Sequence, residues 1–440
     1  MSTRRQHSFS AALATFLAPL ASSQQLYWAD NDFSSSEIWY AEADGSGTPH
    51  QIALAGQRCP HSLAIDECAE AAFWTNACFS PGTGGIYRTV LDGTSNAQLV
   101  IDTKPFLPIG IALDPAARRL YWTEADAAGV RRISTASLTD LQPSVLVVDS
   151  PTTPLTDPIG IQVDHVGGRI YWADYDGHCI GHANLDGSVP AGWPTTILFD
   201  LRPGGEPEGL AIDRARQRIY WADANVFGGQ GIGCGPLNGV GPPDYLPTDL
   251  VYSSGAITMD PVRDMLYFDS EAFPTSAWEI REFDLATHSD TSIHDTLIEF
   301  HGTMAIDLAT VGSTYCAANA NSTGFPAELS ACGSASVSTG DLVLTSMPVP
   351  NQNGIFFHGM NQVQVAFGNG FQCAGGGIVR GAVVSSAGNA ATYAYDNSDP
   401  KHSLAAFIGS TRHFQHWFRD PMGGGALFNT SNATSIPVLP

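Results

Sequence analysis

Basic residues are scarce in this chain. The 440 residues include 20 Lys and Arg against 43 Asp and Glu, which gives a formal net charge of −23. Such a surface repels phosphates, and no basic patch is visible, so nucleic acid is not expected as a partner. Residues 1–310 contain 16 Lys and Arg against 38 Asp and Glu, whereas residues 311–440 contain 4 against 5. The acidity therefore belongs to the first region, which suggests two domains.

Long hydrophobic runs are also missing. The apolar run Phe9–Leu20 is too short to cross a bilayer as a helix. It follows Arg4 and Arg5 and ends in three small residues, an order that is typical of a cleaved secretory signal. We therefore expect residues 1–23 to be a signal peptide. The mature protein would begin near Gln24, be secreted or extracellular, and contain no transmembrane segment.

The motifs of several enzyme and metal-binding classes are absent. The sequence has no HExxH, no GxSxG, no Gly-rich phosphate loop and no CxxC. Eight cysteines, an even number, instead favour disulfides in an oxidising compartment. Five precede residue 310 and three follow it, so either one disulfide joins the two regions or each region keeps a free cysteine. These are Cys59, Cys68, Cys78, Cys179, Cys234, Cys316, Cys332 and Cys373.

An aromatic pair recurs six times, at intervals of 46 to 50 residues, and is followed in most copies by a small residue and an acidic or polar one. The copies are Tyr27–Asp30, Phe73–Asn76, Tyr121–Glu124, Tyr171–Asp174, Tyr220–Asp223 and Tyr267–Ser270. A period of this length is typical of a β-propeller, in which each blade is a four-stranded sheet around a central channel. The repeat predicts an all-β protein with a six-bladed propeller.

A second repeat predicts how the ring closes. Six short strands end in Asp, at residues 63–66, 111–114, 161–164, 210–213, 257–260 and 304–307. The first five precede an aromatic motif by about seven residues, but the sixth has no motif after it, and the motif at Tyr27 has no such strand before it. We therefore expect Met304–Asp307 to be the inner strand of the blade whose second strand is Tyr27–Asp30. This pairing would remove free sheet edges.

These residues resemble the YWTD propeller of the low-density lipoprotein receptor family. The resemblance covers residues 26 to about 308 and includes Leu-Asp-Gly turns at residues 91–93 and 185–187. It implies a propeller over residues 24–310 in which motif Trp residues pack between blades and motif Asp residues accept backbone hydrogen bonds. These structural residues are Trp28, Trp74, Trp122, Trp172, Trp221, Asp30, Asp174 and Asp223. Asn76, Glu124 and Ser270 replace the acid, and Phe268 replaces a Trp, so blades two, three and six are expected to be the irregular ones.

The region 311–440 has a different pattern. Short alternating runs such as Leu342–Thr345 and Val363–Phe367 are separated by Gly or Pro turns, which predicts an antiparallel β-sandwich. Phe371–Cys373 and Phe414–Asp420, among other segments, resemble a poorly characterised C-terminal β-domain of exported bacterial proteins. The resemblance implies a Cys316–Cys373 disulfide, with Cys332 as an addition. It suggests surface retention, sorting or adhesion, or else a plain structural cap.

An enzyme is the alternative function. Six-bladed propellers include lactonases and lyases that hold a divalent metal at the channel mouth with carboxylate, amide or imidazole ligands. The candidate ligands are Glu208, His61, His178, His301 and Asp176. Loop carboxylates are expected by chance in so acidic a chain, so we expect no catalytic residue, no metal and no cofactor. The pair Asp174 and Asp176 before Gly177 could suggest calcium, but the other ligands of a calcium loop are missing.

Binding is the favoured function. In a propeller, the loops after the second strands and the loops that lead into the inner strands lie on one face. The residues expected to form a ligand-binding face there are Phe33, Phe79, Tyr175, Phe227, Phe273, Arg58, His61, Phe106, Glu208 and His301. Aromatic rings within a charged rim suit recognition, although some rings could instead pack against the rim. The sequence thus predicts an exported, non-catalytic protein that binds a protein, peptide or glycan, with a metal-dependent hydrolase or lyase as the alternative.

Overall fold

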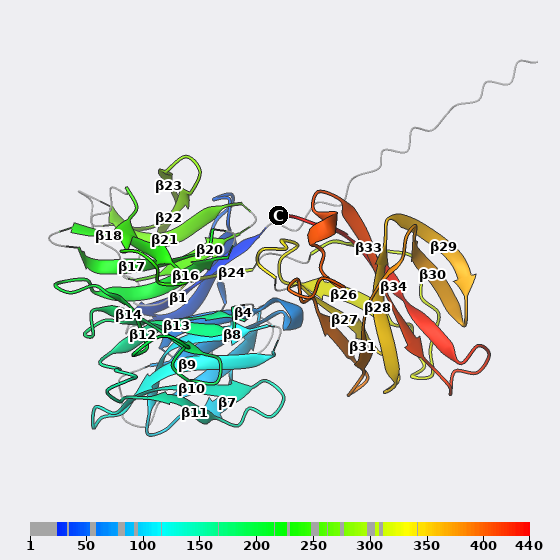
Figure 1. Ribbon diagram of the computed structural model, residues 1–440, viewed down its shortest axis with the longest axis horizontal. Helices are drawn as coiled ribbons and strands as arrows, with labels where there is room; N and C mark the ends of the chain where they lie inside the picture. Colours follow the sequence, from blue (N-terminus) through cyan, green and yellow to red (C-terminus); the bar gives the residue numbers. More distant parts are fainter. Residues whose placement is uncertain are drawn as a thin grey trace, which may run out of the picture.

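The computed structural model describes residues 24–32, 35–52, 59–77, 84–91, 96–115, 117–165, 167–214, 216–226, 229–247, 255–261, 263–272, 277–296, 304–307, 311–340 and 342–440. The expected signal peptide lies outside these residues. The protein is all-β, with a six-bladed propeller and a C-terminal β-sandwich beside it (Figure 1). Its only helical elements among the described residues are two 3₁₀ turns, η1 (Glu67–Ala69) and η2 (Ala405–Phe407).

Six four-stranded antiparallel sheets form the propeller, numbered here by their aromatic motifs. Blades one to three are β24-β1-β2-β3 (Met304–Asp307, Gln25–Asp32, Ser35–Glu42, His50–Ile52), β4-β5-β6-β7 (Pro60–Asp66, Ala71–Asn76, Gly85–Val90, Gln98–Asp102) and β8-β9-β10-β11 (Leu107–Asp114, Arg119–Ala125, Arg131–Ser137, Ser144–Val148). Blades four to six are β12-β13-β14-β15 (Pro158–Asp164, Arg169–Asp174, Cys179–Asn184, Ile197–Asp200), β16-β17-β18-β19 (Pro207–Asp213, Arg218–Val226, Gly229–Pro236, Asp244–Tyr245) and β20-β21-β22-β23 (Ile257–Asp260, Met265–Ala272, Ala277–Asp284, Ser289–Thr296).

The ring closes in blade one, as the orphan motifs predict. The inner strand β24 pairs antiparallel with β1, with Trp28 opposite Met304 and Gln25 opposite Asp307. Neighbouring inner strands also contact one another all the way around, from β4 through β20 to β24 and back to β4. The two ends of the propeller are therefore held in one sheet.

Six buried clusters between neighbouring blades form the propeller core. Each cluster contains the first motif aromatic of one blade and the second motif aromatic of the next: Tyr27 with Trp74, Phe73 with Trp122, Tyr121 with Trp172, Tyr171 with Trp221, Tyr220 with Phe268, and Tyr267 with Trp28. The two rings of a motif point to opposite faces of their strand because side chains alternate along a strand. Consecutive aromatic residues thus fill the interfaces on both sides of every blade.

The blades expected to be irregular are no less regular than the others. A register shift between the first and second strands occurs in blades two, three, four and five, and none interrupts the pairing of β20 with β21 in blade six. That prediction was wrong, and blade two shows a reason: Asn76 accepts a backbone amide as the motif acid does. Asn76 accepts the amide of Cys59 at 2.9 Å, as Asp223 accepts the amide of Glu206 at 2.8 Å.

The Asp residues that end the inner strands connect neighbouring blades. Asp164 accepts the Gly167 amide of its own turn at 2.8 Å, and Arg214, in the corresponding turn of blade five, donates to its other oxygen at 2.7 Å. Arg118 of blade three reaches Asp66 of blade two in the same way, at 2.7 Å. These carboxylates are buried, so the hydrogen bonds compensate for the solvation that they lose.

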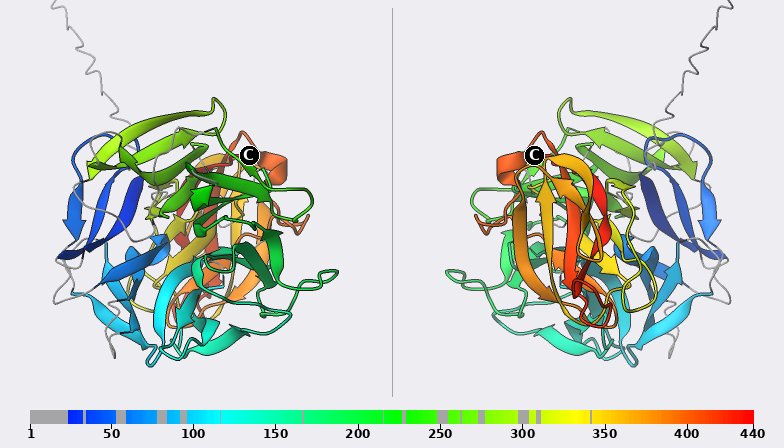
Figure 2. Two further views of the ribbon diagram at one scale, coloured as in Figure 1. Left: turned by 90° about the vertical axis from the view of Figure 1, so that its left-hand side faces the viewer. Right: turned by 90° about the vertical axis from the view of Figure 1, so that its right-hand side faces the viewer.

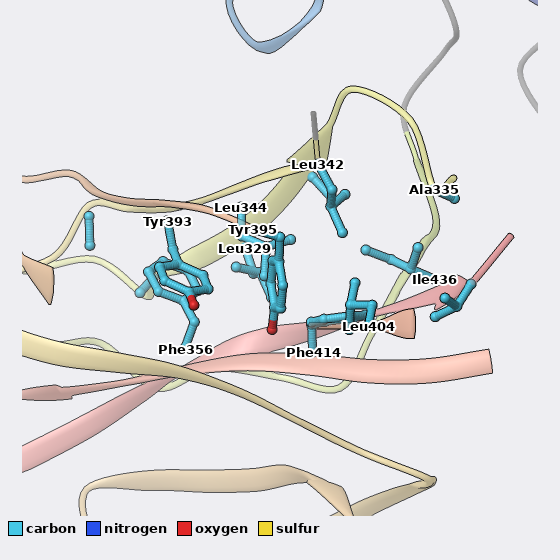
Figure 3. Packing of buried hydrophobic residues seen from close by; sticks show 14 of the residues in the cluster. Leu329, Ala335, Leu342, Leu344, Phe356, Tyr393, Tyr395, Leu404, Phe414 and Ile436 are labelled. Atoms are coloured by element: carbon cyan, nitrogen blue, oxygen red, sulfur yellow. The ribbon is translucent and has the colours of Figure 1, made fainter. Parts of the chain in front are cut away.

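The C-terminal region is a β-sandwich. A five-stranded sheet, β25-β34-β33-β28-β31 (Ser313–Tyr315, Phe428–Pro437, Thr411–Arg419, Asn353–Gly359, Val379–Ser385), packs on a three-stranded sheet, β26-β27-β32 (Glu328–Cys332, Val343–Met347, Ala391–Ala394). Figure 3 shows the core between them, where Leu344 and Tyr393 of the smaller sheet face Phe356 and Phe414 of the larger one. The hairpin β29-β30 (Asn361–Phe367, Gly370–Gly375) is hydrogen-bonded to the larger sheet through Gln415.

The sandwich lies against the centre of one face of the ring (Figure 2). A disulfide joins Cys68, next to η1, to Cys332 at the end of β26. Beside it, the Gly333 amide donates to Glu67 at 2.8 Å, and His165 Nε2 donates to the Gly340 carbonyl at 2.8 Å. Of the two arrangements that cysteine counting left open, the structure contains the disulfide that joins the regions.

Candidate functional site: the two mouths of the propeller channel

The channel has two different mouths. At the first, which we call the covered mouth, the inner strands end and the sandwich docks. At the second, the open mouth, the chain leads into the inner strands and leaves the second strands. The open mouth is the face on which the sequence predicted a ligand-binding surface.

Tyr175 and the loop that leads into β16 meet at the open mouth. The Tyr175 hydroxyl donates to the Glu206 carboxylate at 3.0 Å. Burial, and then the hydrogen bond to Glu206, raises the pKa of Tyr175 to about 12. The residue is half-buried, so part of its surface remains accessible.

Glu208 lies on the inner strand β16 at the same mouth. Its carboxyl group lies against Gly255 of the next blade. A Cβ added to Gly255 would lie only 1.9 Å from Glu208 Oε2, so there is no space for a side chain at residue 255. Burial, together with the negative charges of Asp269, Glu206 and Asp223, raises the pKa of Glu208 to about 8. At pH 7 the neutral carboxylic acid therefore predominates.

Two other residues of the predicted binding face, Phe106 and His61, are half-buried. Phe106 precedes β8 and is half-buried, with the Arg132 guanidinium 3.4 Å from its ring centroid, so the charge covers one face of the ring. His61 is a half-buried residue of the inner strand β4. The remaining predicted binding residues lie outside the described residues: Phe33, Phe79, Phe227, Phe273, Arg58 and His301.

The carboxylate considered for calcium is already paired. Asp174 accepts the amides of Thr156 at 2.8 Å, Asp157 at 2.7 Å and Gly177 at 3.0 Å. His178 donates through Nδ1 to the Gly205 carbonyl at 2.6 Å. Within the described ranges, no three His, Cys, Asp or Glu side chains come together as a group that could hold a metal ion.

The structural motif residues lie where blades meet. Trp74, Trp122, Trp172 and Trp221 are fully buried, and Trp28 is 3% exposed. The Asp223 carboxylate accepts the Tyr245 hydroxyl at 2.9 Å in addition to its backbone partner. The side chain of Asp30 lies outside the described residues, although its backbone is part of β1.

In the sandwich, Cys316 and Cys373 form a disulfide, and Cys179 and Cys234 of the propeller are free and buried.

The sequence reasoning missed a cavity at the covered mouth. It has a volume of about 250 Å³ and is lined by residues of all six inner strands, including Gln162 and Thr258, and by Gly333 and Thr339 of the sandwich. The inner strands could be located from the Asp repeat, but no sequence signal showed that a second domain would cover their ends. The docked sandwich contributes Gly333 and Thr339 to the wall of the cavity.

Comparisons with known proteins agree with the fold. No protein-family model matches the chain. Protein cueball from Drosophila yakuba is 32% identical over 108 residues, which are 24% of this chain and 16% of the relative. Protein cueball from Anopheles gambiae is 44% identical over 62 residues, 14% of this chain and 8% of the relative. The chain thus matches less than a fifth of the length of these curated relatives.

Among solved structures, a chain of a nidogen/laminin complex superposes with a TM-score of 0.50 at 22% identity, covering 64% of this chain and 98% of that chain. At this identity the likeness shows the β-propeller fold alone. No helix in the part of the chain that the structure describes is long and apolar enough to span a membrane.

Proposed function

We propose that this chain is an exported, non-catalytic binding protein whose propeller recognises a protein partner through the open mouth. The docking of the sandwich on the opposite face carries this proposal. A disulfide and two hydrogen bonds commit the covered mouth to the sandwich, so the open mouth is the end of the channel that faces away from it.

The chemistry of the open mouth supports a protein partner. A half-buried aromatic ring at Tyr175 lies beside Glu206 and Glu208, and such a mixture of ring surface and polar groups suits a protein interface. The structural relative in the nidogen/laminin complex is a propeller found together with another protein, which adds support. Disulfides fit an extracellular location.

The excess of acidic residues in region 1–310 favours a partner with a basic surface. Charge complementarity accelerates association, and salt screens it over a distance of about 8 Å at physiological ionic strength. The association rate should therefore fall as salt is added, whereas loss of aromatic contact should mainly raise the dissociation rate.

Capture from the native extracellular medium followed by kinetic measurement tests the proposal. Tyr175→Ala should accelerate dissociation of the captured partner. Leu99→Ala, a change at an exposed position on the outer strand β7, should leave both rates unchanged. If the two variants bind the partner as the parent does, recognition does not involve this mouth.

The runner-up is a metal-dependent hydrolase or lyase, and Glu208 is the residue that favours it. Strongly shifted pKa values cluster at catalytic sites, and Glu208 is a carboxyl with a raised pKa at a channel mouth. In that case calcium would raise the melting temperature, lactones or esters would be turned over, and Glu208→Gln would abolish turnover. Absence of turnover with and without calcium would exclude this alternative for the substrates used.

A further inference from the structure

We propose that the cavity at the covered mouth binds a small, uncharged polyhydroxylated molecule of about the size of a monosaccharide. This ligand would be different from the protein partner of the open mouth and would lie at the other end of the channel. Three features of the cavity carry the inference: its position, its unpaired polar groups and its apolar wall.

The cavity lies between parts that are fixed relative to one another. All six inner strands contribute to its wall, and the sandwich contributes Gly333 and Thr339. Cys68, which also lines it, is bonded to Cys332. A site between covalently joined domains is pre-organised, so a ligand loses little affinity to ordering of the protein. Its volume of about 250 Å³ suits a small molecule rather than a peptide.

Several polar groups on the wall have no partner within the described residues. Thr258 is 8% exposed, and its hydroxyl makes no hydrogen bond there. The Gln162 amide and the Thr339 hydroxyl, both on half-buried residues, also make no hydrogen bond there. These groups border the cavity, so a ligand that entered it would be their hydrogen-bond partner.

The unpaired groups specify the chemistry of that partner. Hydroxyl and amide groups both donate and accept, and a ligand hydroxyl can do the same with each of them. The charged side chains nearby are already used, since Asp164 binds Arg214, and Glu67 accepts the Gly333 amide. An anionic ligand would therefore find no unpaired Lys or Arg among the described residues that line the cavity. The apolar side chains Leu113, Ile212 and Met259 suit the C–H surfaces of a sugar ring.

Calorimetric titration of the full, disulfide-intact chain tests the proposal. D-glucose, D-mannose, myo-inositol and glycerol serve as test ligands. We expect saturable binding of at least one of them at one site per chain. Lack of saturable binding by all four would overturn the proposal and leave ordered water as the occupant of the cavity.

Substitutions then locate the binding. Thr258→Val keeps the β-branched shape and removes a hydroxyl that bonds to no described residue, so it should fold normally. It should weaken binding roughly tenfold, which corresponds to the loss of one hydrogen bond of about 1.4 kcal/mol. Thr339→Val should have a similar effect from the sandwich side. The matched control is Thr291→Val, an exposed position on the outer strand β23 of the same blade as Thr258.

Unchanged affinity in both cavity variants would place the ligand elsewhere and overturn the assignment. Binding at the covered mouth and binding at the open mouth can be tested separately. Thr258→Val should not change the rates of the partner captured at the open mouth, and Tyr175→Ala should not change polyol binding.

Discussion

The indole ring of Trp221 lies directly over Gly233 on the neighbouring strand. A Cβ added to Gly233 would lie 2.1 Å from Trp221 Cε2, and a Cβ added to Gly181 in blade four would lie at the same distance from Trp172 Cε2. Because the ring is also buried against blade four, it has no free space into which to move. The absence of a side chain at residue 233 therefore sets the position of an interblade tryptophan.

We expect Gly233→Ala to destabilise the propeller by about 1–3 kcal/mol, as overpacking in a dense core does. Chemical unfolding followed by tryptophan fluorescence measures the loss. The double variant Gly233→Ala with Trp221→Phe should recover part of it, since the smaller ring leaves space for the methyl group. Additive losses in the double variant would contradict this contact.

Trp172→Ala should cost about 3–5 kcal/mol, because it removes a fully buried ring and leaves a cavity between blades. Val148→Ala, at a position that is 55% exposed on β11, should change stability little. Thermal unfolding of the two variants provides the comparison. Equal shifts in melting temperature would show that Trp172 does not carry interblade packing.

Ending the chain after residue 300 should unfold the propeller, because β1 would lose its partner β24 and blade one would expose an edge. A chain that ends after residue 312 retains β24 and serves as the control. The truncated chain should lose the cooperative transition that calorimetry detects in the control. A native-like transition in both chains would disprove closure by β24.

The sandwich should lose stability on acidification. Burial lowers the pKa of His358 and of His416 from 6.5 to about 3 each, with Arg412 adding to the effect at His358. Both histidines are thus neutral in the folded state, and the unfolded chain binds more protons below pH 6.5. Stability is fully present above pH 6.5 and is lost as the pH falls toward 3. At pH 5 the loss should be about 2 kcal/mol per histidine.

His416→Phe tests the origin of this loss. His416 stacks on Phe356 with centroids 4.2 Å apart, and neither ring nitrogen has a partner within the described residues. Phenylalanine should therefore fit and should reduce the pH dependence of urea unfolding between pH 7.5 and 5 by about half. An unchanged pH dependence would show that groups other than His416 cause the loss of stability in acid.

Replacing both Cys68 and Cys332 by Ser should uncouple the sandwich from the ring. The single thermal transition expected of the parent should separate into two, because the double substitution removes the covalent cross-link of the junction. Cys316→Ser with Cys373→Ser should instead lower the transition of the sandwich alone, typically by 2–4 kcal/mol of unfolding free energy. One undivided transition in the first variant would show that the interface holds without the disulfide.

Local sequence was sufficient to predict the propeller because each blade carries its own motif. The Tyr-Trp pairs and the Asp-ended strands recur with the period of the fold, and the orphaned ends at Tyr27 and Met304 identified the closing pair. Backbone roles were harder to assign. Asn76 looked like a defect in the motif, yet its side-chain oxygen accepts an amide as an Asp does.

The site was less predictable, since it depends on contacts between distant segments. From the sequence, Phe106 is expected to be an accessible aromatic residue of a loop. In the structure, the guanidinium of Arg132, 26 residues later in the chain, covers one face of its ring. Cys68 and Cys332 are 264 residues apart, and cysteine counting could only offer their disulfide as one of two options. The covered mouth and its cavity follow from that disulfide, so neither was visible in the sequence.

The closing pair also determines how the molecule would respond to mechanical load. Gln25 and Asp307 are opposite each other at one end of the pairing between β1 and β24, so a force that pulled the two ends of the propeller apart would unzip this pairing one residue pair at a time. The bond from Cys332 to Cys68 enters blade two instead. Tension applied to the sandwich would therefore be shared between β4 and η1, which it reaches through the disulfide, and the closing strand β24, which it reaches through the main chain.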